Sequence, residues 1–331
     1  MIGRGKKTFC ILFLPAAFLF GQFRIHPAGP LAHTFSIVAR DPATGEMGVA
    51  VQSHWFSVGS AVTWAEAGAG VIATQSLVNV SFGPRGLDLL RQGKTAREVV
   101  RLLIDADEGR DFRQLAVVDA KGNVAVHTGK KCIRDAGHKT GGQFSCQANM
   151  MLDGKVWGAM ARAYQKAEGP LAERLIAALE AGQEAGGDIR GKQSSAILVV
   201  KPQASDKPWE DRLMDLRVED HPEPIRELKR LVRVHRAYEH MNAGDLATEK
   251  SDMKTALAEY RSAEALFPEN LEMKYWHAVS LANTGLLDQA LPIFRDVFSR
   301  DENWRLLTGR LPDSGLLTIS RKDLKKVLDV R

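Results

Sequence analysis

The sequence lacks the short motifs that commonly bind a cofactor or a nucleotide, and it lacks the motif that carries the nucleophilic serine of many hydrolases. No Gly-x-Gly-x-x-Gly dinucleotide fingerprint, complete phosphate-binding loop or Gly-x-Ser-x-Gly nucleophile turn is present. The nine histidines are scattered, and no two have the His-x-x-x-His spacing of a helical metal site. The sequence therefore gives no reason to expect a cofactor or a metal ion.

An excess of charge of one sign is also missing beyond the first 32 residues. The formal net charge of the chain is +5, but residues 1–32 hold four basic side chains and no acidic one, which leaves +1 for residues 33–331. A basic patch for nucleic acid or for anionic lipid is therefore not expected.

Long hydrophobic runs are absent except near the N-terminus. There, three basic residues precede an apolar run at residues 9–20, which is typical of a signal peptide and shorter than the roughly 20 residues that span a bilayer. We expect residues 1–32 to be a signal peptide cleaved after Ala32, with Ala28 as a weaker site. The protein would then be exported to the periplasm or the outside, without stable membrane insertion. A retained anchor is the alternative.

Cysteine is scarce, with three in the chain, and Cys10 would leave with the signal peptide. Cys132 and Cys146 then form an even pair in an oxidising compartment, which favours a disulfide between them. Two free, partly buried thiols are the alternative. A zinc site that also uses His138 matches no common ligand spacing.

Residues 33–234 contain short strand patterns and amphipathic helix patterns. Alternating or continuous apolar runs bounded by turn residues predict strands at residues 34–40, 47–52, 70–75, 115–119, 124–127, 195–200 and 213–218. Apolar residues at helical spacing predict helices at about 84–91, from 95, at 150–166, at 171–185 and from about 222. Thr95 and Glu98 have the spacing of a capping box. Because strands and helices come in separate runs, we predict a layered α+β domain.

Residues 235–331 have helical patterns throughout, with a repeat of 34 residues. Ala256 and Tyr260 recur one period later as Ala290 and Phe294, which is the spacing of tetratricopeptide helix pairs. At most two units fit, and three are usually needed for stability. We therefore expect a small all-α C-terminal domain that docks on the first domain or on another subunit. Partner binding is its expected role, and a purely structural appendage is the alternative.

Seven ordered segments between residues 34 and 234 resemble the domain of unknown function family 1028 (DUF1028). The first begins Thr34-Phe-Ser-Ile-Val-Ala-Arg40 and runs to residue 51; the others are residues 70–76, 82–86, 113–115, 148–150, 186–195 and 215–222. That family resembles the N-terminal-nucleophile (Ntn) hydrolases. The resemblance therefore implies a four-layer αββα sandwich, with two antiparallel sheets between helical layers, and it implies a fold more firmly than a reaction.

Thr34 has the position that the nucleophile occupies in Ntn hydrolases, at the start of a strand directly after the leader. Such a residue attacks an amide carbonyl with its hydroxyl, and its own α-amine, with an ordinary pKa of about 7.7–8.0, serves as the base. Cleavage after Ala32 would leave His33 first and Thr34 with a peptide nitrogen. Cleavage after His33, or trimming of His33, would free the amine. Ser36 is a weaker alternative, and Thr34 without a catalytic role remains open.

Six further polar residues lie at strand ends, at a helix start or in loops, where they could bind substrate or an oxyanion. They are Gln75, Asn79, Arg85, Asn149, Asp188 and Arg190. Each also has a structural explanation. Buried amides often bond to backbone, an asparagine before a helix often caps it, and a surface Asp–Arg pair contributes little.

Two functions follow as hypotheses. The first is an exported amide-bond hydrolase that uses Thr34 on a small amide or peptide. The second is a non-catalytic binding or adaptor protein, with the sandwich as scaffold and the helical tail binding a protein, a peptide or the cell wall. Neither uses a cofactor or nucleic acid, and homo-oligomer formation is open in both.

Overall fold

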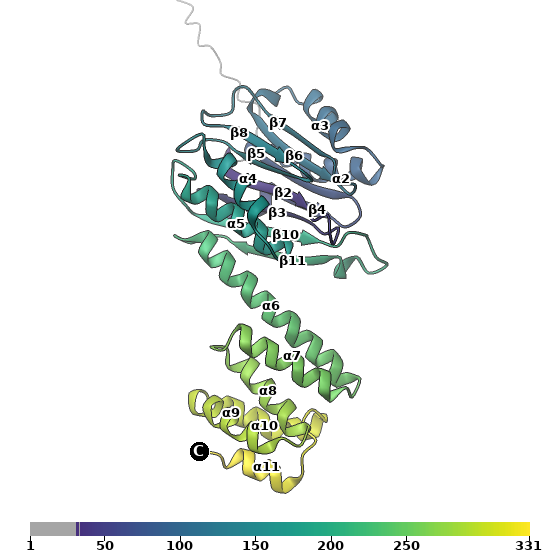
Figure 1. The fold of residues 1–331 in the computed structure, drawn as a ribbon, viewed down its shortest axis with the longest axis vertical. Helices are drawn as coiled ribbons and strands as arrows, with labels where there is room; N and C mark the ends of the chain where they lie inside the picture. The colour runs from purple at the N-terminus through teal and green to yellow at the C-terminus, as the bar shows by residue number, and fades with distance from the viewer. Residues whose placement is uncertain (1–30, 33) are drawn as a thin grey trace, which may run out of the picture.

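The computed structural model describes residues 31, 32 and 34–331 (Figure 1). Two antiparallel sheets with their helices form the N-terminal part, and a helical region follows to the C-terminus. The predicted signal peptide lies outside the described residues except for Leu31–Ala32. Of the helices in the described residues, none combines the length and the apolar character that a bilayer crossing requires.

Each sheet is antiparallel throughout. The first sheet has the order β1 (Leu31–Ala32), β5 (Gly70–Leu77), β6 (Arg113–Asp119) and β7 (Val124–Thr128), and β4 (Thr63–Glu66) also pairs with β5. The second has the order β11 (Arg212–Val218), β10 (Ser194–Val200), β3 (Met47–Ser53), β2 (Thr34–Arg40), β9 (Phe144–Ala148) and β8 (Gly137–Gly141). The hairpins predicted at residues 34–52 and 115–127 are confirmed as β2–β3 and β6–β7.

The two sheets face one another across an apolar core. Val38 and Val49 from the second sheet and Val71 and Val118 from the first belong to the same buried cluster. Successive side chains of a strand point to opposite faces, so β2 contributes Phe35 and Ile37 to the opposite side instead. All seven residues of β2 except the last are buried.

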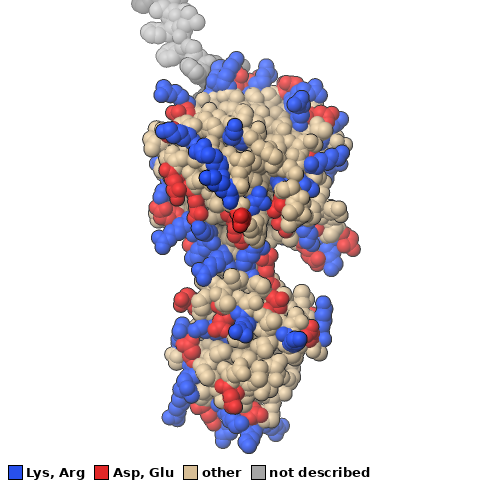
Figure 2. Space-filling view, viewed as in Figure 1, with Lys and Arg blue, Asp and Glu red and all other residues tan. Residues whose placement is uncertain are grey.

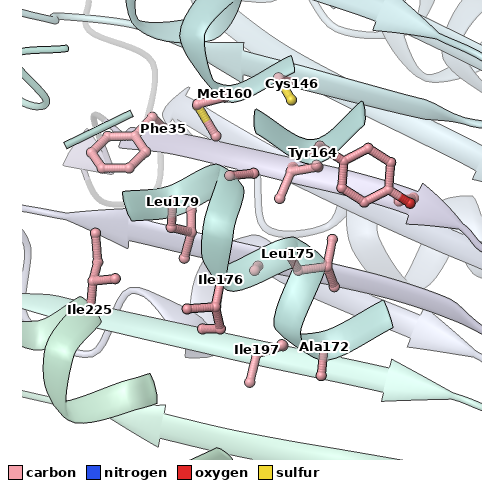
Figure 3. Packing of buried hydrophobic residues seen from close by; sticks show 14 of the residues in the cluster. Phe35, Cys146, Met160, Tyr164, Ala172, Leu175, Ile176, Leu179, Ile197 and Ile225 are labelled. Atoms are coloured by element: carbon pink, nitrogen blue, oxygen red, sulfur yellow. The ribbon is translucent and has the colours of Figure 1, made fainter. Parts of the chain in front are cut away.

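Helices cover the outer faces of both sheets. On the first sheet, α2 (Phe82–Arg91) and α3 (Ala96–Asp105) share a buried cluster with β5 and β6. On the second, α4 (Val156–Lys166) and α5 (Leu171–Glu184) bury side chains such as Met160 and Leu179 beside Phe35 (Figure 3). A four-residue helix, α1 (Gly59–Val62), and two short 3₁₀ turns, η1 (Arg110–Phe112) and η2 (Pro208–Glu210), lie in connecting loops. The capping box of Thr95 and Glu98 at the start of α3 is confirmed.

The structure differs from the sequence analysis at three places. The helix expected from residue 150 begins at Val156, because Met150 has a φ of 59° and Met151 forms a β-bridge with Asp188. Strands β4, β8 and β9 were not predicted. The domain boundary expected between residues 234 and 235 lies inside one continuous helix, α6 (Pro224–Glu249).

Helix α6 connects the two parts of the protein (Figure 1). Its 26 residues span about 39 Å at 1.5 Å per residue. Ile225, Leu228 and Val232 in its first half belong to the core of the second sheet. Ala237 and Met241 in its second half belong to a core shared with the following helix. Because one helix serves both cores, no flexible linker separates them.

The C-terminal region continues with consecutive helices that pack on one another. They are α7 (Met253–Leu266), α8 (Leu271–Asn283), α9 (Leu287–Arg300), α10 (Asn303–Ser314) and α11 (Arg321–Leu328). Tyr275, Ala290 and Phe294 lie in a second core of this region. Figure 2 shows a narrow waist between the region and the sandwich, with charges of both signs spread over the visible face.

Candidate functional site

Polar side chains replace apolar ones at one end of the space between the sheets. Thr34 and Ser36 alternate with Phe35 and Ile37 along β2, so they face the first sheet. Gln75 on β5, Gln114 on β6 and Gln147 on β9 share this inter-sheet face by the same alternation with their apolar neighbours. All five polar side chains are fully buried.

Short side-chain hydrogen bonds across the two sheets join four of these residues, Ser36, Gln75, Gln114 and Gln147. Ser36 Oγ donates to Gln75 Oε1 at 2.6 Å and accepts from Gln147 Nε2 at 2.6 Å. Gln75 Nε2 donates to Gln114 Oε1 at 2.7 Å, and Gln114 Nε2 donates to Thr128 Oγ1 at 2.9 Å. A buried amide without such partners would be costly. The network therefore fixes how the two sheets meet at this end.

The backbone carbonyl of Thr34 accepts hydrogen bonds from two of the predicted site residues. Asn149 donates to it through its backbone nitrogen at 3.1 Å and through Nδ2 at 3.4 Å, and Gln75 Nε2 lies 3.3 Å away. Asn149 Nδ2 also donates to Gln114 Oε1 at 3.0 Å. The helix-capping role considered for Asn149 is therefore wrong: no helix begins there, and its amide positions Thr34 instead.

Asp188 and Arg190 lie at the same end of the second sheet. Thr34 pairs with Ser53 on β3, and the next residue, His54, donates its backbone N–H to Asp188 Oδ2 at 3.3 Å. Arg190 forms a bidentate contact with Asp188, with Nε–Oδ1 at 3.0 Å and Nη2–Oδ2 at 2.7 Å. The Asp188 side chain is fully buried and that of Arg190 is 26% exposed. The pair is thus a partly desolvated anchor of the loop before β10, not the solvated surface pair considered from sequence.

Asn79 and Arg85 lie elsewhere. Asn79 follows β5, where its Oδ1 accepts from the backbone and hydroxyl of Ser81 at 3.2 and 2.7 Å, and its Nδ2 donates to Asp107 at 3.4 Å. Arg85 is exposed on α2. No hydrogen bond within the described part of the chain connects either residue to the amides around Thr34.

The expected disulfide between Cys132 and Cys146 is not formed, which corrects the sequence prediction. Cys146 points into the helix-covered core beside Met160 (Figure 3), and burial raises the pKa of its thiol. Cys132 is half-buried in the loop after β7, where its thiol donates to the carbonyl of Arg113 at 3.4 Å and burial raises its pKa. The two side chains therefore face different environments.

The chain ahead of Thr34 belongs to the other sheet. Leu31 and Ala32 pair with Leu77 and Ser76 of β5, whereas Thr34 begins β2 of the second sheet. In this form Thr34 is fully buried and its nitrogen is part of a peptide bond. Among the described residues, no three His, Cys, Asp or Glu side chains gather as metal ligands would.

Sequence reasoning identified Thr34, Gln75 and Asn149, which the fold brings together, and missed Gln114 and Gln147. Both missed residues lie on strands in positions that alternate with apolar ones. A glutamine at such a position is unusual because polar amides are seldom fully buried. This burial of a glutamine among apolar strand residues is the signal that could have identified Gln114 and Gln147.

Comparison with known proteins gives one consistent result. Residues 34–228 match the model of a family of unknown function, DUF1028. The crystal structure of protein SPO2555 from Silicibacter pomeroyi, assigned to the same family model, is similar at 34% sequence identity and a TM-score of 0.56, over 61% of this chain and 85% of that one. No curated protein is significantly similar. Since the family model covers more than half of the chain, this protein belongs to the DUF1028 family.

Proposed function

We propose that this protein is an exported hydrolase of the Ntn type, in which Thr34 becomes the first residue and attacks an amide bond of a small amide or peptide. The observation that carries the proposal is the position of Thr34. It opens β2, an internal strand of the second sheet, and faces the space between two stacked sheets. This position of Thr34 supports its role as the proposed nucleophile.

The arrangement of layers supports this assignment. Helices α2 and α3 lie on the outer face of one sheet, α4 and α5 lie on that of the other, and the inner faces share an apolar core. This order is the one expected of the αββα sandwich of Ntn hydrolases. The apolar residues 9–20 support export of the chain.

Removal of the residues ahead of Thr34 would change two properties of this site together. It would free the α-amine, and it would withdraw β1 from the edge of β5 next to Gln75. We propose that these changes expose the buried hydroxyl of Thr34 to a substrate.

The proposed reaction follows from the freed amine. As the Thr34 hydroxyl oxygen bonds to the substrate carbonyl carbon, the α-amine takes the hydroxyl proton and then gives it to the leaving nitrogen, whose bond to carbon breaks. The resulting ester on Thr34 is hydrolysed by water, which returns the free hydroxyl. An amine with a pKa of about 7.7–8.0 becomes progressively unprotonated, and so able to accept a proton, as the pH rises through that range, so the rate should rise with pH through the same range.

The test is hydrolysis of a panel of aminoacyl and acyl p-nitroanilides by the exported protein. We expect Thr34→Ala to lower the rate at least about a thousandfold, Thr34→Ser to retain part of it, and both to keep the fold by circular dichroism. Thr44, exposed in the β2–β3 turn, provides the control Thr44→Ala with unchanged rate. Equal rates for Thr34→Ala and the unaltered protein would exclude Thr34 as nucleophile.

A second candidate function, a non-catalytic binding protein, is favoured by one observation. The amide donors of Gln75 and Asn149 are directed at the backbone carbonyl of Thr34, so in this form they hold the scaffold and are not available to an oxyanion. The helical tail would then supply the function. We propose tetratricopeptide-like pairing for it, because Ala256 and Ala290 are both fully buried one 34-residue period apart.

A further inference from the structure

The helical region contains a cavity of about 640 Å³ between α6, α7 and α8. Its walls also include Gly315 and Leu316, which follow α10. This volume is within the range of pockets that hold small ligands or short peptide segments, about 300–1,000 Å³.

The charged side chains that line the cavity are all acidic. They are Asp245, Glu249 and Glu272, and no Lys, Arg or His lies among the lining residues. Within the described residues none of the three takes part in an ion pair. The cavity therefore carries uncompensated negative charge.

Helix ends of both polarities also line this cavity. Helix α6 ends at Glu249 and α8 ends at Asn283, both of which line the cavity, and Gly315 follows the last residue of α10. The C-terminal end of a helix carries a partial negative charge from its aligned peptide dipoles. The N-terminal ends of α7, at Met253, and of α8, near Glu272, line the same cavity with the opposite partial charge, so the three carboxylates determine its net charge.

Aromatic side chains hold two of the carboxylates in place. Tyr260 donates its hydroxyl to Asp245 Oδ1 at 2.7 Å, and Tyr238 donates to Glu272 Oε2 at 2.7 Å. With Trp276 they add three aromatic rings to the walls. Aromatic faces attract cations, so rings and carboxylates here favour the same kind of ligand.

A buried hydroxyl in the wall lacks a partner. Ser280 is 3% exposed, lines the cavity, and its Oγ has no hydrogen-bond partner among the described residues. Buried hydroxyl groups are normally satisfied. Its oxygen is covered by neighbouring atoms, so a ligand ammonium or guanidinium N–H group would donate to it only after the Ser280 side chain turned toward the cavity.

We propose that this cavity binds a lysine or arginine side chain of a peptide segment from a partner protein. The volume exceeds what one side chain fills, so neighbouring residues of the segment would occupy the rest. The inference concerns the tail alone and does not depend on Thr34.

The proposal can be tested by fluorescence anisotropy with the whole purified protein at low salt. The probe is a fluorescein-labelled peptide of alternating Lys and Ala, with an Arg–Ala peptide and a Glu–Ala peptide for comparison. We expect the two basic peptides to bind at least about tenfold more tightly than the acidic one and to weaken with added salt, since salt screens exposed charges.

Isosteric variants locate the site. Asp245→Asn and Glu249→Gln should each weaken binding of the Lys–Ala peptide about two- to fivefold, as expected for partly exposed charge pairs. Asp329→Asn, an exposed carboxylate outside the cavity, should leave binding unchanged. Full affinity in both cavity variants, or equal binding of the acidic peptide, would overturn the site. Free spermidine that binds as tightly as the peptide would overturn the assignment to a peptide segment.

Discussion

Replacement of Gln75 by leucine tests whether the buried amide network holds the two sheets together. Gln75 accepts from Ser36 Oγ at 2.6 Å and donates to Gln114 Oε1 at 2.7 Å. In Gln75→Leu the Ser36 hydroxyl loses its acceptor inside a fully buried site, which costs about 1–3 kcal/mol. Gln114 Oε1 loses the hydrogen bond from Gln75 but still accepts one from Asn149 at 3.0 Å, so losing the Gln75 bond costs less, about 1 kcal/mol. The expected decrease in the free energy of unfolding is about 2–4 kcal/mol.

Urea unfolding followed by tryptophan fluorescence measures this decrease as a lower midpoint at unchanged slope. The control is Gln289→Leu, because Gln289 is exposed on α9 and such substitutions change stability by about 0.5 kcal/mol or less. The double variant Ser36→Ala with Gln75→Leu should cost less than the sum of the single ones, since it removes the orphaned hydroxyl. If Gln75→Leu shifts the midpoint no more than Gln289→Leu does, the network does not stabilise the sandwich.

Two further predictions concern the tail and the cysteines. A Cβ atom on Gly244 would lie 2.6 Å from Tyr260 Cε1, so Gly244→Ala should lower the stability of the tail by about 1–3 kcal/mol in thermal unfolding. Gly309 on α10 has no atom within 4 Å of such a Cβ, so Gly309→Ala should raise the stability of the tail by about 0.5–1 kcal/mol. A loss of stability in both variants would refute the steric argument. In non-reducing conditions the unfolded protein should alkylate at both Cys132 and Cys146, while the folded protein reacts at Cys132 first, because Cys146 is fully buried. A mass lower by two hydrogens, with neither thiol alkylated, would show a disulfide instead.

The sequence predicted those strands and helices whose apolar pattern and turn residues match the burial that they have in the fold. The β2–β3 and β6–β7 hairpins combine apolar strand patterns with clear turn residues. Strand β8, Gly137–Gly141, was missed because it is largely polar and exposed and so has no apolar alternation. Strand β9, Phe144–Ala148, does alternate, but its apolar positions are only Phe, Cys and Ala, which is a weak strand signal. The predicted domain boundary at residue 234 falls inside helix α6. The apolar residues of its first half pack in the core of the second sheet and those of its second half pack in the core of the tail, although the helix itself is continuous.

The candidate site was predictable only in part. Thr34 could be found because it opens the first strand after the leader, and Gln75 because it lies toward the end of a predicted buried strand. Asn149 was selected at the start of an expected helix, which in the structure begins only at Val156. The contacts of Gln114 and Gln147 depend on which strands face each other across the sandwich, which no local pattern records. The disulfide prediction was wrong for the same reason. The spacing of Cys132 and Cys146 does not reveal that one thiol lies in the helix-covered core and the other in a half-buried loop.

The central claim is that Thr34 becomes the N-terminal nucleophile of the exported protein. The measurement that tests it most directly is the intact mass of the protein recovered after export, with N-terminal sequencing of the same sample. A chain that begins at Thr34 is the predicted result. A chain that still carries His33 or any earlier residue would contradict the claim, because the nitrogen of Thr34 would then remain in a peptide bond and could not accept the proton.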